Sequence, residues 1–270
     1  MLTATDLVFR VGSRVLVNRF SQPFEPGNLH LIIGPNGAGK TTLVRLLARL
    51  LRPDSGTIEF EGSDIGRWKE RDLAKVRALL SQSVEVAFPI PVSELVIMGR
   101  YPHFDTYPNE TDLEICQEVM RFFNVDEFAH RNYETLSGGE RQSVQFARVL
   151  AQIWRPVQGA TRYLFLDEPL TFLDIRHQID FMEKLRTFAS QRDVTVVGVV
   201  HDLNLAAQFA DRLLLLNHGE ILAVGTADEV LSEEHLRTAF DIAPIQLANP
   251  ATGKIHLVYE SNRGGAGPRR

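Results

Sequence analysis

The sequence predicts an α/β fold in which a mostly parallel sheet is covered by helices on both faces. Apolar stretches of strand length recur along the chain and alternate with segments whose apolar residues have helical spacing. Three such stretches, at 163–169, 194–202 and 212–217, are mostly apolar until they reach a polar end. Strands of this kind are typical of parallel sheets, because parallel strands are buried on both faces.

The N-terminal part of the chain is dominated by strands and turns. The expected strands lie at 7–11, 14–20 and 29–34, and residues 54–62 are expected to form a turn that leads to a further strand. Gly12-Ser13 and Pro26-Gly27 mark turns between them, and a helix is expected at 41–51. We therefore expect an N-terminal antiparallel β subdomain beside the main sheet.

The middle of the chain has a different pattern. A helix is expected at 69–80, overlapping a short strand that ends at Gln82, and two prolines follow. The next segments have helical spacing and lie at 92–99, 111–123 and 138–152. We expect a helical subdomain at about 84–157, inserted in a single domain of residues 1–260. The Gly/Pro-rich segment 261–270 is expected to be a disordered tail.

Composition narrows the class of protein. The single cysteine, Cys116, excludes an internal disulfide framework. No stretch approaches the roughly 20 apolar residues of a membrane span, and the N-terminus lacks the pattern of a signal peptide. The formal net charge of -5 gives no general attraction to nucleic acid, so no nucleic-acid partner is expected. We expect a soluble protein that reaches a membrane only through a partner.

Residues 34–41, GPNGAGKT, fit the phosphate-binding pattern G-x-x-x-x-G-K-[ST] in full. Glycines let successive backbone N–H groups turn toward phosphate oxygens, and the following helix adds its N-terminal dipole. Lys40 can reach the β- and γ-phosphates, and the Thr41 hydroxyl suits Mg²⁺. A simple helix start is the alternative. The expected nucleotide-binding residues are Gly34, Pro35, Asn36, Gly37, Ala38, Gly39, Lys40, Thr41 and Thr42.

Polar residues also follow three other expected strands. In a parallel sheet the carboxyl ends of the strands meet at one edge, which is the edge of the phosphate-binding loop. Asp167 is the expected magnesium partner, and Glu168 is the expected carboxylate that polarises an attacking water. His201 is placed to contact the γ-phosphate, and Gln82 is a candidate for sensing magnesium or water. The alternative for the two carboxylates is capping of the next helix.

The stretch LSGGE at 136–140 identifies the family. Together with the phosphate-binding loop, LFLDEP, Gln82 and His201, in that order, it resembles the nucleotide-binding subunit of ATP-binding-cassette (ABC) transporters. The resemblance covers the chain from about Leu7 to about Leu231. It implies ATP and Mg²⁺ as cofactors and a homodimer in which each subunit completes the other's site. The expected residues acting on the partner's ATP are Ser137, Gly138, Gly139 and Glu140.

The same resemblance implies further partners and roles. Asp174 lies where the family has its dimer-interface loop, and residues 81–104 lie where the subunit receives a helix of a membrane permease. The wording MGRYPHF at 98–104 resembles importers of iron-siderophore, haem and cobalamin. These importers imply two permease copies, an indirect periplasmic binding protein and a peripheral location at the cytoplasmic face of the bacterial inner membrane.

Two departures from the common pattern matter. Val11 stands where the family usually has an aromatic residue that stacks on adenine, so we expect weaker base discrimination. A polar loop at 154–162 precedes the carboxylate strand, and with the following LDIRHQ it resembles haem importers more than the siderophore or cobalamin branches. As a physical element this loop is a tolerated insertion.

The mechanism implied is ATP hydrolysis that drives import. Lys40 and the loop amides bind the phosphates, Thr41, Gln82 and Asp167 hold Mg²⁺, Glu168 activates water, and His201 steadies the transferred group. One alternative is a soluble ABC ATPase without a transport role. A P-loop kinase or GTPase is a second, although the sequence lacks the N-K-x-D motif of a GTPase.

Overall fold

The computed structural model describes residues 1–81, 86, 88–171, 173–250 and 252–259. Its largest element is a six-stranded sheet of order β10-β9-β3-β8-β7-β6. The strands are β3 (Leu29–Ile33), β6 (Arg77–Leu80), β7 (Arg162–Asp167), β8 (Val194–Val199), β9 (Arg212–Asn217) and β10 (Glu220–Gly225). Five of these strands are parallel and β10 pairs antiparallel with β9. The predicted α/β class with a mostly parallel sheet is therefore confirmed.

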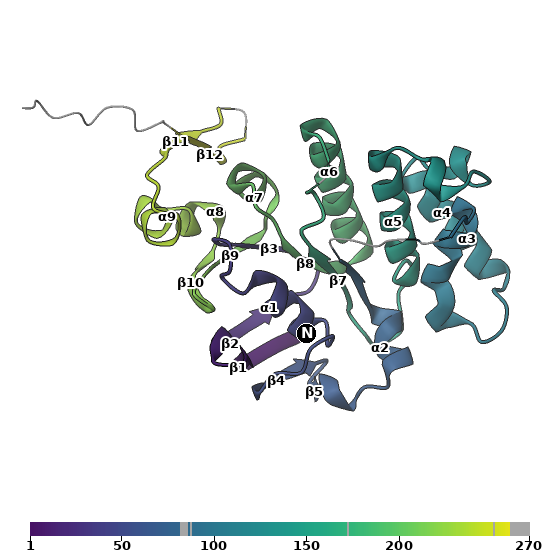
Figure 1. Ribbon diagram of the computed structural model, residues 1–270, viewed down its shortest axis with the longest axis horizontal. Helices are drawn as coiled ribbons and strands as arrows, with labels where there is room; N and C mark the ends of the chain where they lie inside the picture. The colour runs from purple at the N-terminus through teal and green to yellow at the C-terminus, as the bar shows by residue number, and fades with distance from the viewer. Residues whose placement is uncertain (82–85, 87, 172, 251, 260–270) are drawn as a thin grey trace, which may run out of the picture.

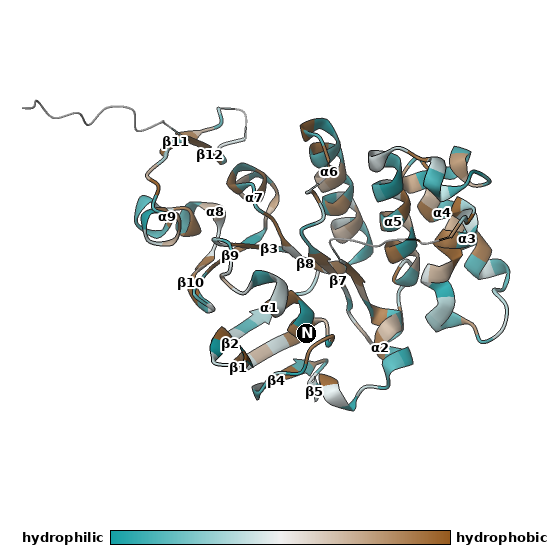
Figure 2. Ribbon diagram, in the orientation of Figure 1, coloured by the Kyte–Doolittle hydropathy of each residue, from teal (hydrophilic) through white to brown (hydrophobic). Residues whose placement is uncertain are grey.

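Each central strand divides its side chains between two hydrophobic cores. In β7, Leu164 and Leu166 face one core while Tyr163 and Phe165 face the other. This alternation follows from the two-residue repeat of a strand, and burial on both faces explains why these stretches are apolar throughout. Figure 2 shows the resulting hydrophobic band along the sheet, with hydrophilic residues on the outward side of the helices.

The N-terminal antiparallel subdomain lies against the core on the α1 side (Figure 1). It is a four-stranded sheet of order β2-β1-β4-β5. The strands are β1 (Leu2–Val11), β2 (Arg14–Phe24), β4 (Ser55–Phe60) and β5 (Ser63–Asp64). Gly12 allows the tight β1–β2 turn because its φ is 59°, which places Arg14 opposite Val11.

The segment between β6 and β7 is helical, as expected, and forms the far end of the molecule in Figure 1. Its elements are α3 (Val92–Ile97), η2 (Met98–His103), α4 (Glu110–Phe122), η3 (Asp126–Phe128), η4 (Tyr133–Thr135) and α5 (Gly138–Gln152). A buried ion pair, Arg100 Nε to Asp112 Oδ1 at 3.0 Å, ties η2 to α4. Arg100 also donates to the carbonyl of Ala151 at the end of α5. The exact limits of the inserted subdomain, 84–157, stay a prediction.

The helix expected at 69–80 is wrong at its C-terminal end. The helix α2 (Glu70–Val76) stops before Arg77, where β6 begins and pairs in parallel with β7. Arg77 donates to Glu70 at the start of α2 and to the distant carbonyl of Ala48, and this contact and the pairing with β7 override helical spacing. Gln82 and the tail at 261–270 lie outside the described residues.

The chain after β10 holds elements that the sequence did not predict. These are α8 (Ala227–Val230), α9 (Glu233–Phe240), β11 (Ile245–Ala248) and β12 (Ile255–Val258). The β11–β12 hairpin is attached to α7 (Leu203–Phe209), where the Asn204 amide exchanges two hydrogen bonds with the backbone of Leu257. None of the helices in the described part of the chain is long and apolar enough to span a membrane.

The loop at 154–162 is fixed to the core at its first residue. Trp154 is buried, stacks on Phe188 of α6 (Ile175–Arg192) with 5.4 Å between ring centroids, and is covered by the Arg192 guanidinium at 3.7 Å. The buried Arg162 donates to the carbonyls of Ile153 and Trp154 and so closes the base of the loop. The loop is a packed connection away from the strand ends that carry the expected site.

Candidate nucleotide-binding site

The phosphate-binding loop, hereafter the P-loop, connects β3 to α1 (Lys40–Leu47). Gly34, Gly37 and Gly39 have φ values of 150°, 79° and 95°. A Cβ on Gly34 would lie 2.3 Å from the Leu216 carbonyl oxygen, and one on Gly39 would lie 2.1 Å from that of Leu16. Glycine is therefore required at both positions by backbone conformation and by close packing.

The Lys40 side chain is held over the P-loop by backbone carbonyl groups of the loop itself. Its Nζ donates to the carbonyl oxygens of Gly34 at 2.9 Å and Pro35 at 3.1 Å, and the side chain is 5% exposed. Burial lowers the pKa of Lys40, whereas the nearby Glu168 and Asp167 raise it. A buried ammonium group with two carbonyl partners is a preformed point charge for an anion.

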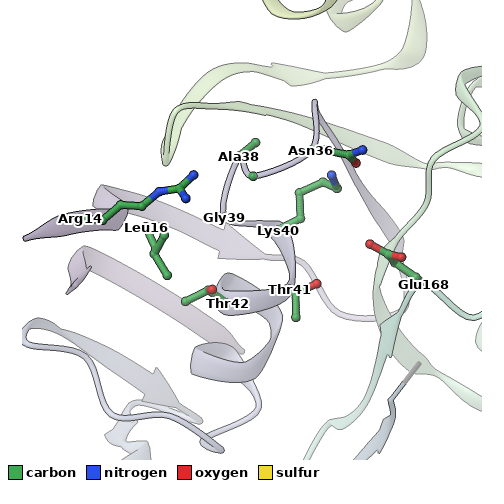
Figure 3. Close-up of a pocket in the computed structure, with 10 residues that line it drawn as sticks. Arg14, Leu16, Asn36, Ala38, Gly39, Lys40, Thr41, Thr42 and Glu168 are labelled. Atoms are coloured by element: carbon green, nitrogen blue, oxygen red, sulfur yellow. The ribbon is translucent and has the colours of Figure 1, made fainter. Parts of the chain in front are cut away.

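A cavity of about 260 Å³ lies over the P-loop. Residues 36–42 line it together with Arg14, Leu16 and Glu168. Figure 3 shows Arg14 and Glu168 at opposite ends of the cavity, with the P-loop between them. Of the nine predicted nucleotide-binding residues, only Gly34 and Pro35 are not among the lining residues, and their carbonyls accept hydrogen bonds from Lys40.

The predicted magnesium ligands Thr41 and Asp167 are brought together. The Thr41 hydroxyl donates to Asp167 Oδ1 at 2.7 Å, although 126 residues separate them. Arg45, one turn further along α1, lies 3.5 Å from Asp167 Oδ2. Hydroxyl and carboxylate oxygens are the hard ligands that Mg²⁺ prefers, and Mg²⁺ commonly takes its remaining ligands from phosphate and water. The pair therefore fits Mg²⁺, while the third predicted ligand, Gln82, is outside the described residues.

Glu168 and His201 form the second pair at the same sheet edge. His201 Nε2 lies 2.7 Å from Glu168 Oε1. The Glu168 side chain is 17% exposed and lines the P-loop cavity, whereas His201, 46% exposed, lies next to the cavity and reaches it through Glu168. The arrangement places a carboxylate and an imidazole beside the P-loop, where a general base and a hydrogen-bond donor to phosphate are expected.

The LSGGE residues form the start of α5. Ser137 caps the helix: its Oγ accepts from the Glu140 amide, and the Glu140 carboxylate accepts from the Ser137 amide at 2.6 Å. This cap uses the Glu140 amide and leaves the backbone N–H groups of Gly138 and Gly139 available to an anion. None of residues 137–140 is among the described residues that line the P-loop cavity. In Figure 1, α5 and α1 stand in different parts of the molecule.

Asp174 caps α6 and also contacts a residue that the sequence analysis missed. Both carboxylate oxygens of Asp174 lie 2.8 Å from His177 Nδ1. The other ring nitrogen of His177 faces Gly139, at 3.8 Å from the point where a Cβ would stand. The His177 imidazole therefore lies between the expected dimer loop and the start of the LSGGE helix, and the sequence LDIRHQ was the only signal for it.

Arg14 and Leu16 are also cavity residues that the sequence analysis did not single out. They lie two residues apart on β2 and so share one face of the strand. The available signal was their position just after the Val11 turn. That position alone does not place them at the site. The packing of the Leu16 carbonyl against Gly39 is what brings both residues to the cavity.

A family model described as "ABC transporter" matches residues 17–171, more than half of the chain. The chain belongs to the ABC transporter family. As an ABC ATPase it binds ATP and is the ATP-hydrolysing component of a transport system. The predicted family and enzyme class are confirmed.

Three relatives of this ABC protein share one name. It is 44% identical over 253 residues to a "Hemin import ATP-binding protein HmuV" of Gloeobacter violaceus, covering 94% of this chain and 92% of the relative. Proteins of the same name from Methylobacillus flagellatus and Escherichia coli O157:H7 are 40% and 39% identical, covering 94% and 96% of this chain and 94% and 100% of the relatives.

Solved ABC structures share the fold. A metal-chelate-type ABC transporter in an inward-facing conformation matches with a TM-score of 0.80 and 26% identity, covering 96% of this chain and 97% of that chain. A dimeric bacterial ABC transporter cassette matches with a TM-score of 0.71 and 21% identity, covering 84% and 99%. The predicted ABC ATPase fold, with its β subdomain and helical region, is confirmed.

Proposed function

We propose that this ABC ATPase works as a homodimer with two copies of an integral membrane permease and drives the import of hemin. The assignment of hemin as the cargo is supported by the relatives, which are named hemin import proteins and match over nearly the whole chain. The chemistry rests on one observation, the convergence of the Thr41–Asp167 and Glu168–His201 pairs beside the P-loop cavity.

The P-loop residues bind the triphosphate. Backbone N–H groups of residues 37–42 surround the β- and γ-phosphates, and Lys40 transfers its hydrogen bonds from the carbonyls of Gly34 and Pro35 to phosphate oxygens. Thr41, Asp167 and Gln82 would hold Mg²⁺, which supplies charge neutralisation on the β- and γ-phosphates. Arg45 keeps the Asp167 carboxylate oriented toward this position.

Glu168 is the proposed general base. Its carboxylate lines the cavity at the end opposite Arg14. With the γ-phosphate at that end, it would orient a water for in-line attack and accept the proton. His201 steadies Glu168 in the free protein and donates to the transferred phosphoryl group during hydrolysis. Both roles are mainly positioning and charge stabilisation.

The second half of each site comes from a partner copy. Ser137, Gly138, Gly139 and Glu140 form a capped helix N-terminus that lies outside the P-loop cavity of its own chain. Supplied in trans, the Ser137 hydroxyl and the amide of Gly139 complete the cage around the γ-phosphate. Asp174 is placed by α6 in the loop that would run along the dimer interface.

The permease contacts are proposed for the helical part of the chain. Phe88, Tyr101 and Tyr107 are exposed there by 54%, 56% and 82%, and exposed aromatic side chains are enriched at protein interfaces. With a permease bound at this surface, the subunit is peripheral at the cytoplasmic face of the inner membrane. A periplasmic binding protein would deliver the cargo to the other side.

The cargo is tested in a strain that lacks this gene and its own synthesis of haem. Wild-type protein should restore hemin-dependent growth, while ferric siderophore and cobalamin uptake should not depend on it. Restoration of siderophore or cobalamin uptake instead would replace hemin as cargo within the same machinery. Failure to co-purify with any integral membrane protein would favour a soluble ABC ATPase.

The catalytic assignment is tested by Glu168→Gln. The amide keeps the size of the side chain but cannot accept the proton of water, so kcat should fall by roughly 100- to 10,000-fold while ATP binding persists. Gel filtration with ATP should show an accumulated dimer, because the closed state cannot hydrolyse its nucleotide. Undiminished hydrolysis would remove Glu168 from this role, and Glu183→Gln on α6 is the control.

A further inference from the structure

The cavity over the P-loop has no aromatic ring at the end away from Glu168, where the base of a nucleotide would lie. Within the described part of the chain, no aromatic side chain lines it. Val11, which stands where the family usually has an aromatic residue, is 60% exposed. Phe9 does not replace it, since it is half-buried and packs against the hydrophobic core of the antiparallel subdomain.

Arg14 occupies that end instead. It is the first residue of β2, faces Val11 across the turn and shares a strand face with Leu16. The close approach of the Leu16 carbonyl to Gly39 fixes β2 against the P-loop. As a result, a terminal nitrogen of Arg14 lies 3.1 Å from the point where a Cβ on Gly37 would stand, and Figure 3 shows the side chain reaching toward the P-loop.

The Arg14 guanidinium is not committed to another group. Among the described residues it has no ion pair, hydrogen bond or ring contact, whereas Arg45 is paired with Asp167. Glu168 lies at the opposite end of the cavity (Figure 3), and its proposed role as general base makes that the end for the γ-phosphate. A triphosphate laid over the P-loop from Glu168 therefore directs its ribose and base toward Arg14.

We propose that Arg14 binds the adenine base of ATP, its planar guanidinium stacked on the purine ring and the Val11 and Leu16 side chains beside it. Arginine is suited to this role because its delocalised cation stacks on aromatic faces, which the compact ammonium of lysine does not do. Stacking reads the face of a base and not its edge, so it tolerates a change of purine. Arg14 is thus a specificity-determining residue of a site that rests on the proposed ATPase function.

Binding of three ligands separates base stacking from a phosphate contact. The ligands are the non-hydrolysable β,γ-imido analogues of ATP and GTP, and inorganic tripolyphosphate, each titrated calorimetrically with Mg²⁺. Wild-type protein should bind the two nucleotides with affinities within about threefold of each other. Arg14→Ala should weaken both by about 5- to 30-fold and leave tripolyphosphate binding unchanged.

Further variants sharpen the test. Arg14→Lys keeps the positive charge but lacks the planar guanidinium, so its affinities for the three ligands should resemble those of Arg14→Ala. Val11→Tyr in the Arg14→Ala background should recover ATP binding by supplying a ring across the same turn. Arg19→Ala removes an exposed arginine from the same strand and should leave all three affinities unchanged.

Three results would overturn the assignment. An equal loss for ATP and tripolyphosphate in Arg14→Ala would make Arg14 a phosphate ligand. Retained nucleotide binding in Arg14→Lys would show that charge and not stacking is what Arg14 supplies. Unchanged ATP affinity in Arg14→Ala would exclude any role in binding. Failure of the wild-type protein to bind both ATP and tripolyphosphate would instead contradict the proposed nucleotide site itself.

Discussion

Glu168 stands at the end of β7 in a left-handed backbone conformation with φ 54°. Such a φ is uncommon for a residue with a side chain and is tolerated where the surrounding structure enforces it, often at functional sites. Here the turn after Asp167 carries the Glu168 side chain toward His201 and into the P-loop cavity. The two neighbouring carboxylates therefore point in different directions: Asp167 contacts Thr41, whereas Glu168 faces His201 and the cavity.

At the same scale, Lys40→Ala should weaken ATP binding. The variant removes a buried cation whose hydrogen bonds to phosphate are charge-assisted, each worth about 1.5–3 kcal/mol, so the Kd should rise by roughly 10- to 100-fold. Calorimetry with a non-hydrolysable ATP analogue measures the change. Lys69→Ala, an exposed lysine that does not line the cavity, is the control. An unchanged Kd in Lys40→Ala would place the phosphates elsewhere.

At the scale of elements, the helical part depends on side chains that join its short helices. The Arg100–Asp112 pair is buried on both sides, with 5% and 2% of the two side chains exposed. Asp112 also completes the capping box of α4 by accepting from the Asn109 amide. One carboxylate therefore fixes the start of α4 and the position of η2, the segment that carries the exposed ring of Tyr101.

Asp112→Ala should lower the free energy of unfolding by about 3–5 kcal/mol, because it leaves the Arg100 cation buried without its partner. Urea unfolding followed by circular dichroism measures this loss. The matched control is Glu233→Ala in the exposed Arg237–Glu233 pair, which should cost less than about 1 kcal/mol. Equal losses of unfolding free energy in the two variants would show that the buried pair contributes no more to stability than the exposed pair.

At the scale of the whole molecule, two hydrophobic cores on opposite faces of the main sheet carry the stability. A buried histidine, His30 of β3, sits at the start of the strand that leads to the P-loop. Its Nε2 lies 3.1 Å from the Glu25 carbonyl oxygen, and its ring packs edge-on against Phe24. Burial lowers the pKa of His30 despite the opposing fields of Glu25 and Asp211; Arg212 lowers it further.

This histidine should make the protein less stable in mild acid. Because the folded pKa is below the ordinary value of 6.5, the unfolded chain takes up a proton between pH 6.5 and the folded pKa that the folded chain does not. Stability should therefore fall as the pH drops below 6.5, by at most about 1.4 kcal/mol per pH unit for this group.

The measurement compares urea unfolding at pH 7.5 and pH 5.5. His30→Gln should lose less stability over this interval than the wild-type protein does, whereas His130→Gln, at an exposed position, should follow the wild type. The same loss of stability in all three proteins would assign the acid sensitivity to other groups.

The sequence by itself determined the family, the α/β class and most of the nucleotide-binding and catalytic candidates. It could do so because the P-loop, the strand-end carboxylates and LSGGE are local patterns, each encoded within a few residues of an element end. The strand ends could be assigned to one edge of the sheet because parallel topology requires it.

Tertiary structure alone decided the rest. The pairing of Thr41 with Asp167, the early end of α2, the imidazole between Asp174 and Gly139, and the position of Arg14 depend on segments far apart in the chain. No local pattern specifies these contacts, because they follow from how two cores pack against one sheet and bring β2 against the P-loop.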